Sequence, residues 1–379
     1  MRQGYAKLHM PISDGTWVII GDVTVDIGTI KCLATVGVNL DKLYEREDIT
    51  LSLKDLTIVG VHPTEKATGE FAEKAFQQDI ERLGGIEKVQ AIVIDQGPDV
   101  TKGAKLLREA NEQLKVIHDI THKLALVLEK DLKGNPQWDE YTELLAKTKK
   151  LVQQTEFAGV QPPNQRSKAR FMNTALHIDW IGELQEKRRT GCLRDVAPER
   201  YDEYFGWTTR FLPLVDIWQQ KVGVVEMIKA TVRRHGLSED VYNHLIAIFD
   251  QMPFDEVITA QDGFLCNALD AMYEEVEKLN DNQVLPASTE VLESLFGSYK
   301  NHTAKGGHGI TGNILTIAAL AGAPSTVDEI CAVMEDTPIR KMLTWVENKI
   351  GNTLGKMRNL GAFKKTKIDI AFDGVPAFS

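Results

Sequence analysis

The sequence has few cysteines and no long apolar run, and each absence excludes a class of protein. Its four cysteines are scattered along 379 residues without a C-x-x-C pair. That arrangement argues against a zinc ribbon or a disulfide framework and favours a reducing cytoplasm. The longest apolar runs, such as LALVL at 124–128, are far too short to cross a membrane. The first 15 residues lack the apolar segment of a signal peptide.

An excess of positive charge is also lacking. The chain has 44 Lys and Arg against 54 Asp and Glu, a formal net charge of −10. Such a balance argues against a protein that binds nucleic acid through its overall charge. Basic residues are nevertheless clustered at 166–170, 187–194 and 340–367. Charge clusters are usually solvated surface, so these leave a DNA-binding function open without establishing it.

Residues 1–134 alternate between strand-like and helix-like segments. Three segments rich in Val, Ile and Thr come first, at 16–28, 30–40 and 56–63. The segments after them predict, in order, a helix at 69–85, a strand at 89–95, a helix at 100–113, a strand at 114–120 and a helix at 121–134. This order predicts an α/β fold in which an antiparallel meander continues into parallel strands. It is similar to the order of the ribonuclease H-like fold, so we expect a mixed sheet of that type.

From residue 135 to about 285 the strand signal disappears. Apolar residues at helical spacing continue through this stretch and predict a large all-helical insertion. We interpret its four tryptophans as core residues: Trp138, Trp180, Trp207 and Trp218. Alternatively, Lys168, Arg170 and Trp180 form a basic and aromatic segment of the kind that binds single-stranded DNA. Residues 286–379 then complete the first domain with a helix at 286–302, an apolar helix and a basic helical tail.

Three acidic residues stand out once these segments are placed. Asp22 lies within the first expected strand, Asp95 ends the fourth, and Glu293 lies on the helix after the insertion. Strands one and four are neighbours in a ribonuclease H-like sheet, so Asp22 and Asp95 would lie side by side. Adjacent carboxylates repel each other and are best kept ionised by hard divalent cations. A third carboxylate completes a site for two metals roughly 4 Å apart, which suits phosphodiester cleavage.

Lys300 adds a basic group to the helix that carries Glu293. Seven positions separate the two residues, nearly two helical turns, so both lie on one face. The same helix carries Leu292, Leu295 and Phe296, so part of it must be buried. We therefore expect Glu293 at the rim of the buried face and Lys300 beside a phosphodiester chain that crosses the helix. An ordinary exposed amphipathic helix is the alternative, since Glu and Lys are good helix formers.

Three segments resemble the DDE transposases of bacterial insertion sequences: IVIDQGPDVTKGAKLL, VIHDITHKLALVLEKDL and STEVLESLFGSYK followed by GITGNILTIAAL. The resemblance covers most of the chain, more clearly outside the helical insertion. It implies that Asp22, Asp95 and Glu293 bind Mg²⁺ or Mn²⁺ and cut and join DNA at transposon ends. It further implies double-stranded DNA as partner, at transposon ends and target, a homodimer on that DNA, and no membrane association.

The sequence departs from this family in two respects. Pro286 and Thr289 stand where the Tyr and Arg of the family's Tyr-Arg-Glu-Lys signature would lie, although Glu293 and Lys300 match its last part. The family usually carries an N-terminal DNA-binding domain, and hardly any residues precede the first expected strand. We therefore expect a copy without that domain.

The stretch 18–38 also supports a second interpretation. Its VDIGTIKCL resembles the phosphate loop of actin-like kinases and ATPases, in which Asp26 would turn the chain around a nucleotide phosphate. The second loop of such proteins is rich in glycine, whereas Pro98 and Asp99 occupy that place here. We favour Asp22, acting on a DNA phosphodiester, with Asp26 as the alternative first ligand. A non-catalytic DNA-binding relic is the third interpretation.

Asp119 and His122 follow the fifth expected strand and are secondary candidates for the site. Asp is a common helix cap, so we interpret Asp119 as the cap of the next helix and His122 as a partly buried side chain. The transposase resemblance places a similar D-x-x-H near the active site. The residues expected to contact DNA are Lys168, Arg170 and Lys300.

Overall fold

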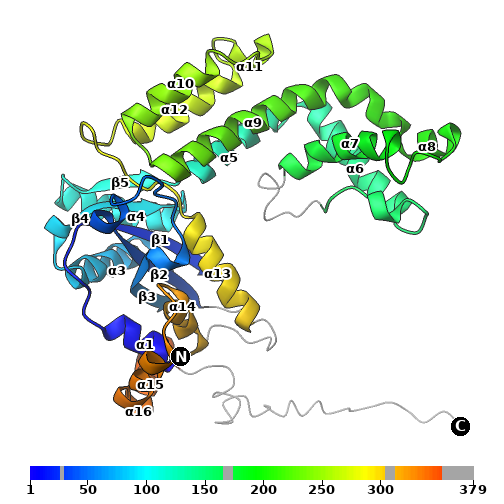
Figure 1. Ribbon diagram of the computed structural model, residues 1–379. Helices are drawn as coiled ribbons and strands as arrows, with labels where there is room; N and C mark the ends of the chain where they lie inside the picture. The colour runs from blue at the N-terminus through cyan, green and yellow to red at the C-terminus, as the bar shows by residue number, and fades with distance from the viewer. Residues whose placement is uncertain (26–29, 165–173, 304–311, 352–379) are drawn as a thin grey trace, which may run out of the picture.

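The computed structural model describes residues 1–25, 30–164, 174–303 and 312–351 (Figure 1). Its centre is a five-stranded mixed sheet in the order β3-β2-β1-β4-β5. The strands are β1 (Trp17–Val25), β2 (Lys31–Asn39), β3 (Leu56–Thr64), β4 (Val89–Ile94) and β5 (Lys115–His118). The first three pair antiparallel, whereas β1–β4 and β4–β5 pair parallel. The predicted meander followed by parallel strands is confirmed.

The two faces of the sheet build separate cores because successive side chains of a strand point to opposite faces. Trp17 and Ile19 of β1 belong to the core under α3 (Gly69–Arg82) and α4 (Pro98–Ala110). Val18 and Ile20 belong to the other core, which continues into α5, α13 and α14. These three helices span Ile120–Leu132, Glu290–Thr303 and Leu315–Leu320. Figure 1 shows α3 and α13 on opposite sides of the sheet.

A helical region follows α5 and extends away from the sheet (Figure 1). It contains α6 (Pro136–Val152), α7 (Thr174–Arg189), α8 (Pro198–Phe205), α9 (Leu212–His235), α10 (Glu239–Phe249), α11 (Glu256–Thr259) and α12 (Phe264–Val276). Among its described residues no strand occurs, and one isolated bridge joins Leu237 to Leu285. The backbone N–H of Ile120 donates to the carbonyl of Ala287, so the chain returns beside the point where it left the sheet.

The tryptophans of this region form an aromatic core, as expected. Trp138 stacks edge-on against Trp218 with ring centroids 5.0 Å apart, and both rings contact Tyr141. Trp180 is 5% exposed, and its indole N–H donates to the carbonyl of Val160. A buried ring of this kind has no free face for a nucleobase. The interpretation of Trp180 as part of a DNA-binding segment is therefore wrong.

Several elements differ from the prediction. The chain begins with α1 (Arg2–His9), which the sequence pattern did not indicate, and the C-terminal part holds α15 (Val327–Asp336) and α16 (Ile339–Ile350). The helix expected from residue 286 begins at Glu290. Residues 286–289 form no regular element and are tied to the start of α5, through Ala287 to Ile120 and through Thr289 to Asp119. None of the helices in the described ranges is both long and apolar enough to span a bilayer.

Candidate functional site

Asp22 and Asp95 lie at the same end of two adjacent parallel strands. Gly21 of β1 is paired with Ile94 of β4, and each aspartate comes one residue later. In β1, Val18 and Ile20 face α5 and α13, so the alternation of the strand directs Asp22 to that side. Ala91 and Val93 of β4 face the same way, and the same parity applies to Asp95. The sheet thus directs two carboxylates toward the two helices that carry His122 and Glu293.

The Asp22 carboxyl group is the most perturbed acid of this cluster. Burial first, and then the negative charge of Asp95, raise its pKa to about 6, against a hydrogen bond from the backbone N–H of Val23. The charges of His122 and Glu293 also act on it. A buried carboxyl group beside a second negative charge forms a place where positive charge is stabilised.

Asp119 joins the helices on this side of the sheet. It is fully buried and caps α5 by accepting from the backbone N–H of Thr121 at 2.6 Å, which confirms the predicted cap. Its second oxygen accepts from the backbone N–H of Thr289 at 2.9 Å and from the Thr289 hydroxyl. Burial opposes ionisation, but the hydrogen bonds from His122 and Thr289 outweigh it and lower the pKa of Asp119. One carboxylate therefore fixes the start of α5 against the start of α13.

His122 connects this buried carboxylate to Glu293. Its Nδ1 donates to Asp119 Oδ2 at 3.0 Å, and its Nε2 lies 3.4 Å from Glu293 Oε1. The hydrogen bond to Asp119, with the charges of Asp119, Glu293 and Asp95, raises the pKa of His122 to about 9 against the effect of burial. The ring is 32% exposed, as the interpretation of a partly buried side chain predicted. It carries a positive charge at neutral pH among carboxylates.

Glu293 lies at the rim of α13, as expected. Its side chain is 44% exposed, whereas Leu292 and Leu295 on the same helix are fully buried. Partial burial raises the pKa of Glu293, and the charge of His122 opposes that shift. Lys300 lies two turns further along α13 and is exposed. The charges of Asp95 and Glu293 both act on Asp22, and His122 contacts Glu293 directly, so these side chains form one electrostatic cluster.

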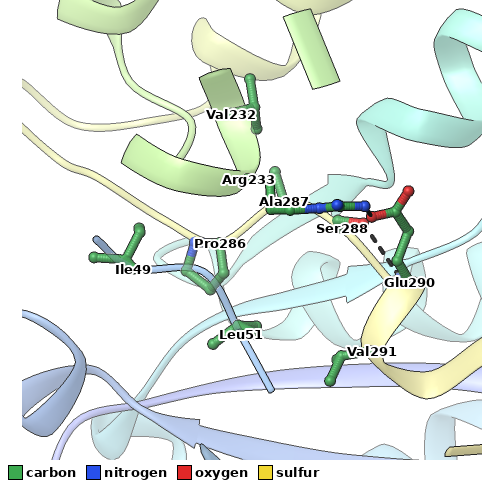
Figure 2. A pocket seen from close by; sticks show the side chains of 9 residues that line it. All are labelled: Ile49, Leu51, Val232, Arg233, Pro286, Ala287, Ser288, Glu290 and Val291. Atoms are coloured by element: carbon green, nitrogen blue, oxygen red, sulfur yellow. Dashed lines mark hydrogen bonds and ion pairs between the residues drawn. The ribbon is translucent and has the colours of Figure 1, made fainter. Parts of the chain in front are cut away.

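The first turn of α13 is held by a further ion pair. Arg233, in the last turn of α9, pairs with Glu290, and the two side chains close a small cavity of about 40 Å³ (Figure 2). Ile49, Leu51 and Val291 line the same cavity. Its size suits a single water molecule. This contact holds the start of α13 against the end of α9, and the charge of Glu290 also acts to raise the pKa of Glu293, one turn away.

Three predicted residues fall outside the described ranges: Asp26, Lys168 and Arg170. Within those ranges, no group of three or more His, Cys, Asp or Glu side chains is close enough together to hold one metal ion. The charges of the candidate acids therefore act on one another, but the acids do not form a closed set of metal ligands.

Sequence reasoning missed a second buried charge network behind β5. The Glu275 carboxylate of α12 is 1% exposed and accepts from Lys123 Nζ and from the backbone N–H of His118, both at 2.8 Å. Lys278 Nζ also pairs with it. Burial alone would raise the pKa of Glu275, but the two lysines outweigh it and hold the pKa below its usual value. The Glu275–Lys278 spacing was a local signal, whereas the partner Lys123 lies 152 positions away.

We expect Glu275→Gln to lower the free energy of unfolding by about 3 kcal/mol at pH 7, because it removes the buried counter-charge of Lys123 and leaves that lysine paired with the exposed Glu274. A lowered pKa in the folded state stabilises the protein above about pH 4.3 and ceases to do so as pH falls. The stability lost in the variant should therefore shrink in acid, as urea denaturation across a pH series would measure.

Glu274→Gln is the matched control, because Glu274 also pairs with Lys123 but is 69% exposed. An equal loss in both variants, or a deficit independent of pH, would contradict this account.

Comparison with known proteins adds no assignment to this geometry. No protein-family model matches the chain, and no curated protein matches it either. The functional argument therefore depends on the cluster itself.

Proposed function

We propose that the protein is a metal-dependent DNA nuclease and strand transferase of the DDE transposase type, with a ribonuclease H-like catalytic core. One observation carries the proposal. Asp22 and Asp95 follow paired residues of adjacent parallel strands, and their charges interact with Glu293 from a helix beyond a large helical region. The strand order and the return of the chain to α13 are compatible with that fold.

The donor set suits hard divalent cations by its chemistry, although its members do not form a closed ligand set in the described part of the structure. It consists of carboxylate oxygens, which Mg²⁺ and Mn²⁺ prefer, and bound positive charge would offset both causes of the raised pKa of Asp22, first its burial and then the charge of Asp95. Asp22, Asp95 and Glu293 would hold the ions. When bound, two such ions activate the attacking oxygen of a phosphodiester cleavage and stabilise the leaving one.

The remaining side chains would position the acids and the substrate. His122, tied to Asp119, holds a positive charge beside Glu293 and orients that carboxylate toward the end of the sheet. Asp119 holds the starts of α5 and α13 together through Thr289. Lys300, exposed on α13, supplies a cation for a phosphate that passes along the helix.

The actin-like alternative receives less support from the start of α4. A phosphate-binding helix start needs free backbone N–H groups. Here Pro98 occupies the first turn and has no N–H, and the N–H of Gly97 already donates to Asp95 Oδ1 at 2.9 Å. A nucleotide phosphate would therefore find few donors at this position.

The test compares two activities of the same protein. Nicking and strand transfer are measured on plasmids that carry the DNA flanking the gene, with Mg²⁺ or Mn²⁺ and with EDTA, and Mg·ATP binding is measured by calorimetry. The proposal expects cleavage that requires the divalent metal and no micromolar ATP binding. If the protein binds ATP at micromolar concentration and cleaves no DNA with either metal, the actin-like alternative replaces the proposal. If it binds DNA but neither cleaves DNA nor binds ATP, the protein is a non-catalytic DNA-binding relic.

We expect Lys300→Ala to weaken DNA binding and to reduce the slope of log K against log salt by about one phosphate contact. The reason is the loss of one cation beside the proposed path of the backbone. Fluorescence anisotropy over a salt series measures this slope. Lys74→Ala is the matched control, because Lys74 is exposed on α3, on the opposite face of the sheet. A slope change of the same size in both variants would remove Lys300 from the DNA path.

A further inference from the structure

The carboxylate of Glu275 on α12 is buried at the end of β5, and the proposed chemistry makes no use of it. Its Oε2 accepts from the backbone N–H of His118 at 2.8 Å, and its Oε1 accepts from Lys123 Nζ at the same distance. Lys278 Nζ pairs with it from three positions along the chain. Burying a carboxylate is costly even when its oxygens are bonded. Glu274 holds Lys123 from an exposed position, so the contact that Glu275 adds is the one with β5.

The end of β5 is joined directly to the main chain beside Asp95. His118 is paired with Ile94 of β4, and the backbone N–H of Asp119 donates to the carbonyl of Ile94 at 2.8 Å. The ring of His118 is hydrogen-bonded to the backbone of Asp95. A displacement of His118 would therefore move the main chain from which the Asp95 carboxylate projects.

Lys123 connects the same carboxylate to the helix on the other side of the site. It follows His122 on α5, and its side chain is 8% exposed. The position of α5 decides where the ring of His122 meets Glu293 Oε1, at 3.4 Å. α12 packs against α5 and α9, and Figure 1 shows these helices running from the sheet into the helical region. Glu275 thus bonds the helical region both to the strand end beside Asp95 and to the helix that carries His122.

Any effect of Glu275 on the candidate site is one of position rather than of charge. Glu275 is not among the charges with the largest effects on Asp22 or Glu293. Its own charge is balanced by Lys123 and Lys278, which both pair with it. The groups of a binding site must be held within about 0.5 Å of their working positions, and Mg²⁺ demands a nearly ideal octahedral geometry. A shift of β5 or α5 too small to unfold the protein would therefore weaken metal binding.

We propose that Glu275 is a positioning residue for the candidate metal site, and that the helical region sets the affinity of this site for a divalent cation through it. The carboxylate holds the end of β5 beside Asp95 and seats α5 so that His122 meets Glu293. The inference rests on the proposed function, because it takes the acidic cluster as a site for Mg²⁺ or Mn²⁺. A residue with only a structural role would change the stability of the fold and leave the metal affinity of the folded protein unchanged.

Two variants of the same network separate these roles. Glu275→Gln removes the charge that holds Lys123 and weakens the bond to His118. Lys278→Gln removes a partner of Glu275 but leaves its bonds to β5 and α5 in place. Both variants should be less stable than the wild type in urea. Glu275→Gln should bind Mn²⁺ at least about tenfold more weakly, as electron paramagnetic resonance of the unbound ion measures. Lys278→Gln should bind it as tightly as the wild type, and circular dichroism shows that both variants are folded in the assay.

Nicking of DNA gives a second readout of the same effect. In Glu275→Gln the Mn²⁺ concentration for half-maximal nicking should rise at least about tenfold, and saturating Mn²⁺ should restore most of the rate. Wild-type Mn²⁺ affinity in Glu275→Gln, or an equal loss in both variants, would overturn the inference and leave the proposed function intact. Because Mn²⁺ affinity is measured without DNA, it decides the inference even if the wild type cleaves no DNA and the proposed function fails. A wild type that binds no divalent cation would overturn both.

Discussion

Asp95→Asn is expected to abolish metal-dependent DNA nicking, with a loss of at least about a thousandfold in rate. The change removes a negative charge from the cluster of Asp22, Asp95 and Glu293 but preserves the shape of the side chain. The asparagine Oδ1 can still accept the hydrogen bond from the backbone N–H of Gly97, so the start of α4 should stay intact. DNA affinity should stay within about threefold, because binding depends on basic groups rather than on this carboxylate.

The comparison needs a variant that removes a charge nearby without touching the cluster. Asp99→Asn serves, since Asp99 lies in the first turn of α4 and its charge does not act on Asp22. It should nick DNA at the wild-type rate. Full nicking by Asp95→Asn with Mg²⁺ would exclude Asp95 as a ligand. Loss of ATP turnover with unchanged DNA behaviour would instead support the actin-like alternative.

The sheet was predictable because each of its strands has a local sequence signal. The β-branched segments at 16–28, 30–40 and 56–63 are bounded by turn residues, and they pair in chain order, β1 with β2 and β2 with β3, as consecutive strands commonly do. The helix at 69–85 and the strand at 89–95 also appear close to where the pattern placed them. Hydrophobic periodicity is enough to predict a helix or strand that has one buried face.

Elements that depend on distant contacts were not predictable in the same way. The residues of α1 have no capping signal, and the helix is held by contacts with α14 and by Arg2, more than 300 positions from its acceptor. The start of α13 was displaced from 286 to Glu290 because Asp119, 170 positions earlier, binds Thr289. Of the start residues that local propensity favoured, Thr289 directly precedes the helix and its carbonyl accepts from Leu292 and Glu293, whereas Pro286 lies outside it.

Some residues of the candidate site were likewise predictable from the sequence, and others were not. Asp22 and Asp95 could be paired from the sequence because strand order fixes which strand ends are neighbours. Glu293 could be proposed from its helix, but its contact with His122 depends on how α5 and α13 meet. Thr289 carried no signal of its own, since Thr before a helix is ordinary. Its role appears only once the Asp119 carboxylate is found fully buried beside it.

Asp119→Ala is expected to be the most destabilising change in this region, lowering the free energy of unfolding by about 4 kcal/mol. The carboxylate accepts from backbone N–H groups of both Thr121 and Thr289, from the Thr289 hydroxyl and from His122. Alanine would leave these donors buried without an acceptor and would remove the cap of α5. Urea denaturation in EDTA measures the loss without any contribution from metal binding.

The size of this effect distinguishes a carboxylate that holds the starts of two helices together, here called a clamp, from an ordinary cap of one helix. Asp255 caps α11 by accepting from the backbone N–H of Val257, but it is exposed, and its bond to α9 runs from its backbone N–H to Gln220, which alanine would keep. Asp255→Ala should therefore cost about 1 kcal/mol or less. If Asp119 acts only as a cap, the two variants will lose similar amounts and the starts of α5 and α13 will not be coupled. If it is the clamp that the geometry indicates, Thr289→Val should by itself reproduce a large part of the Asp119→Ala loss. The double variant should then lose less than the sum of the two single changes, because both remove the same contact.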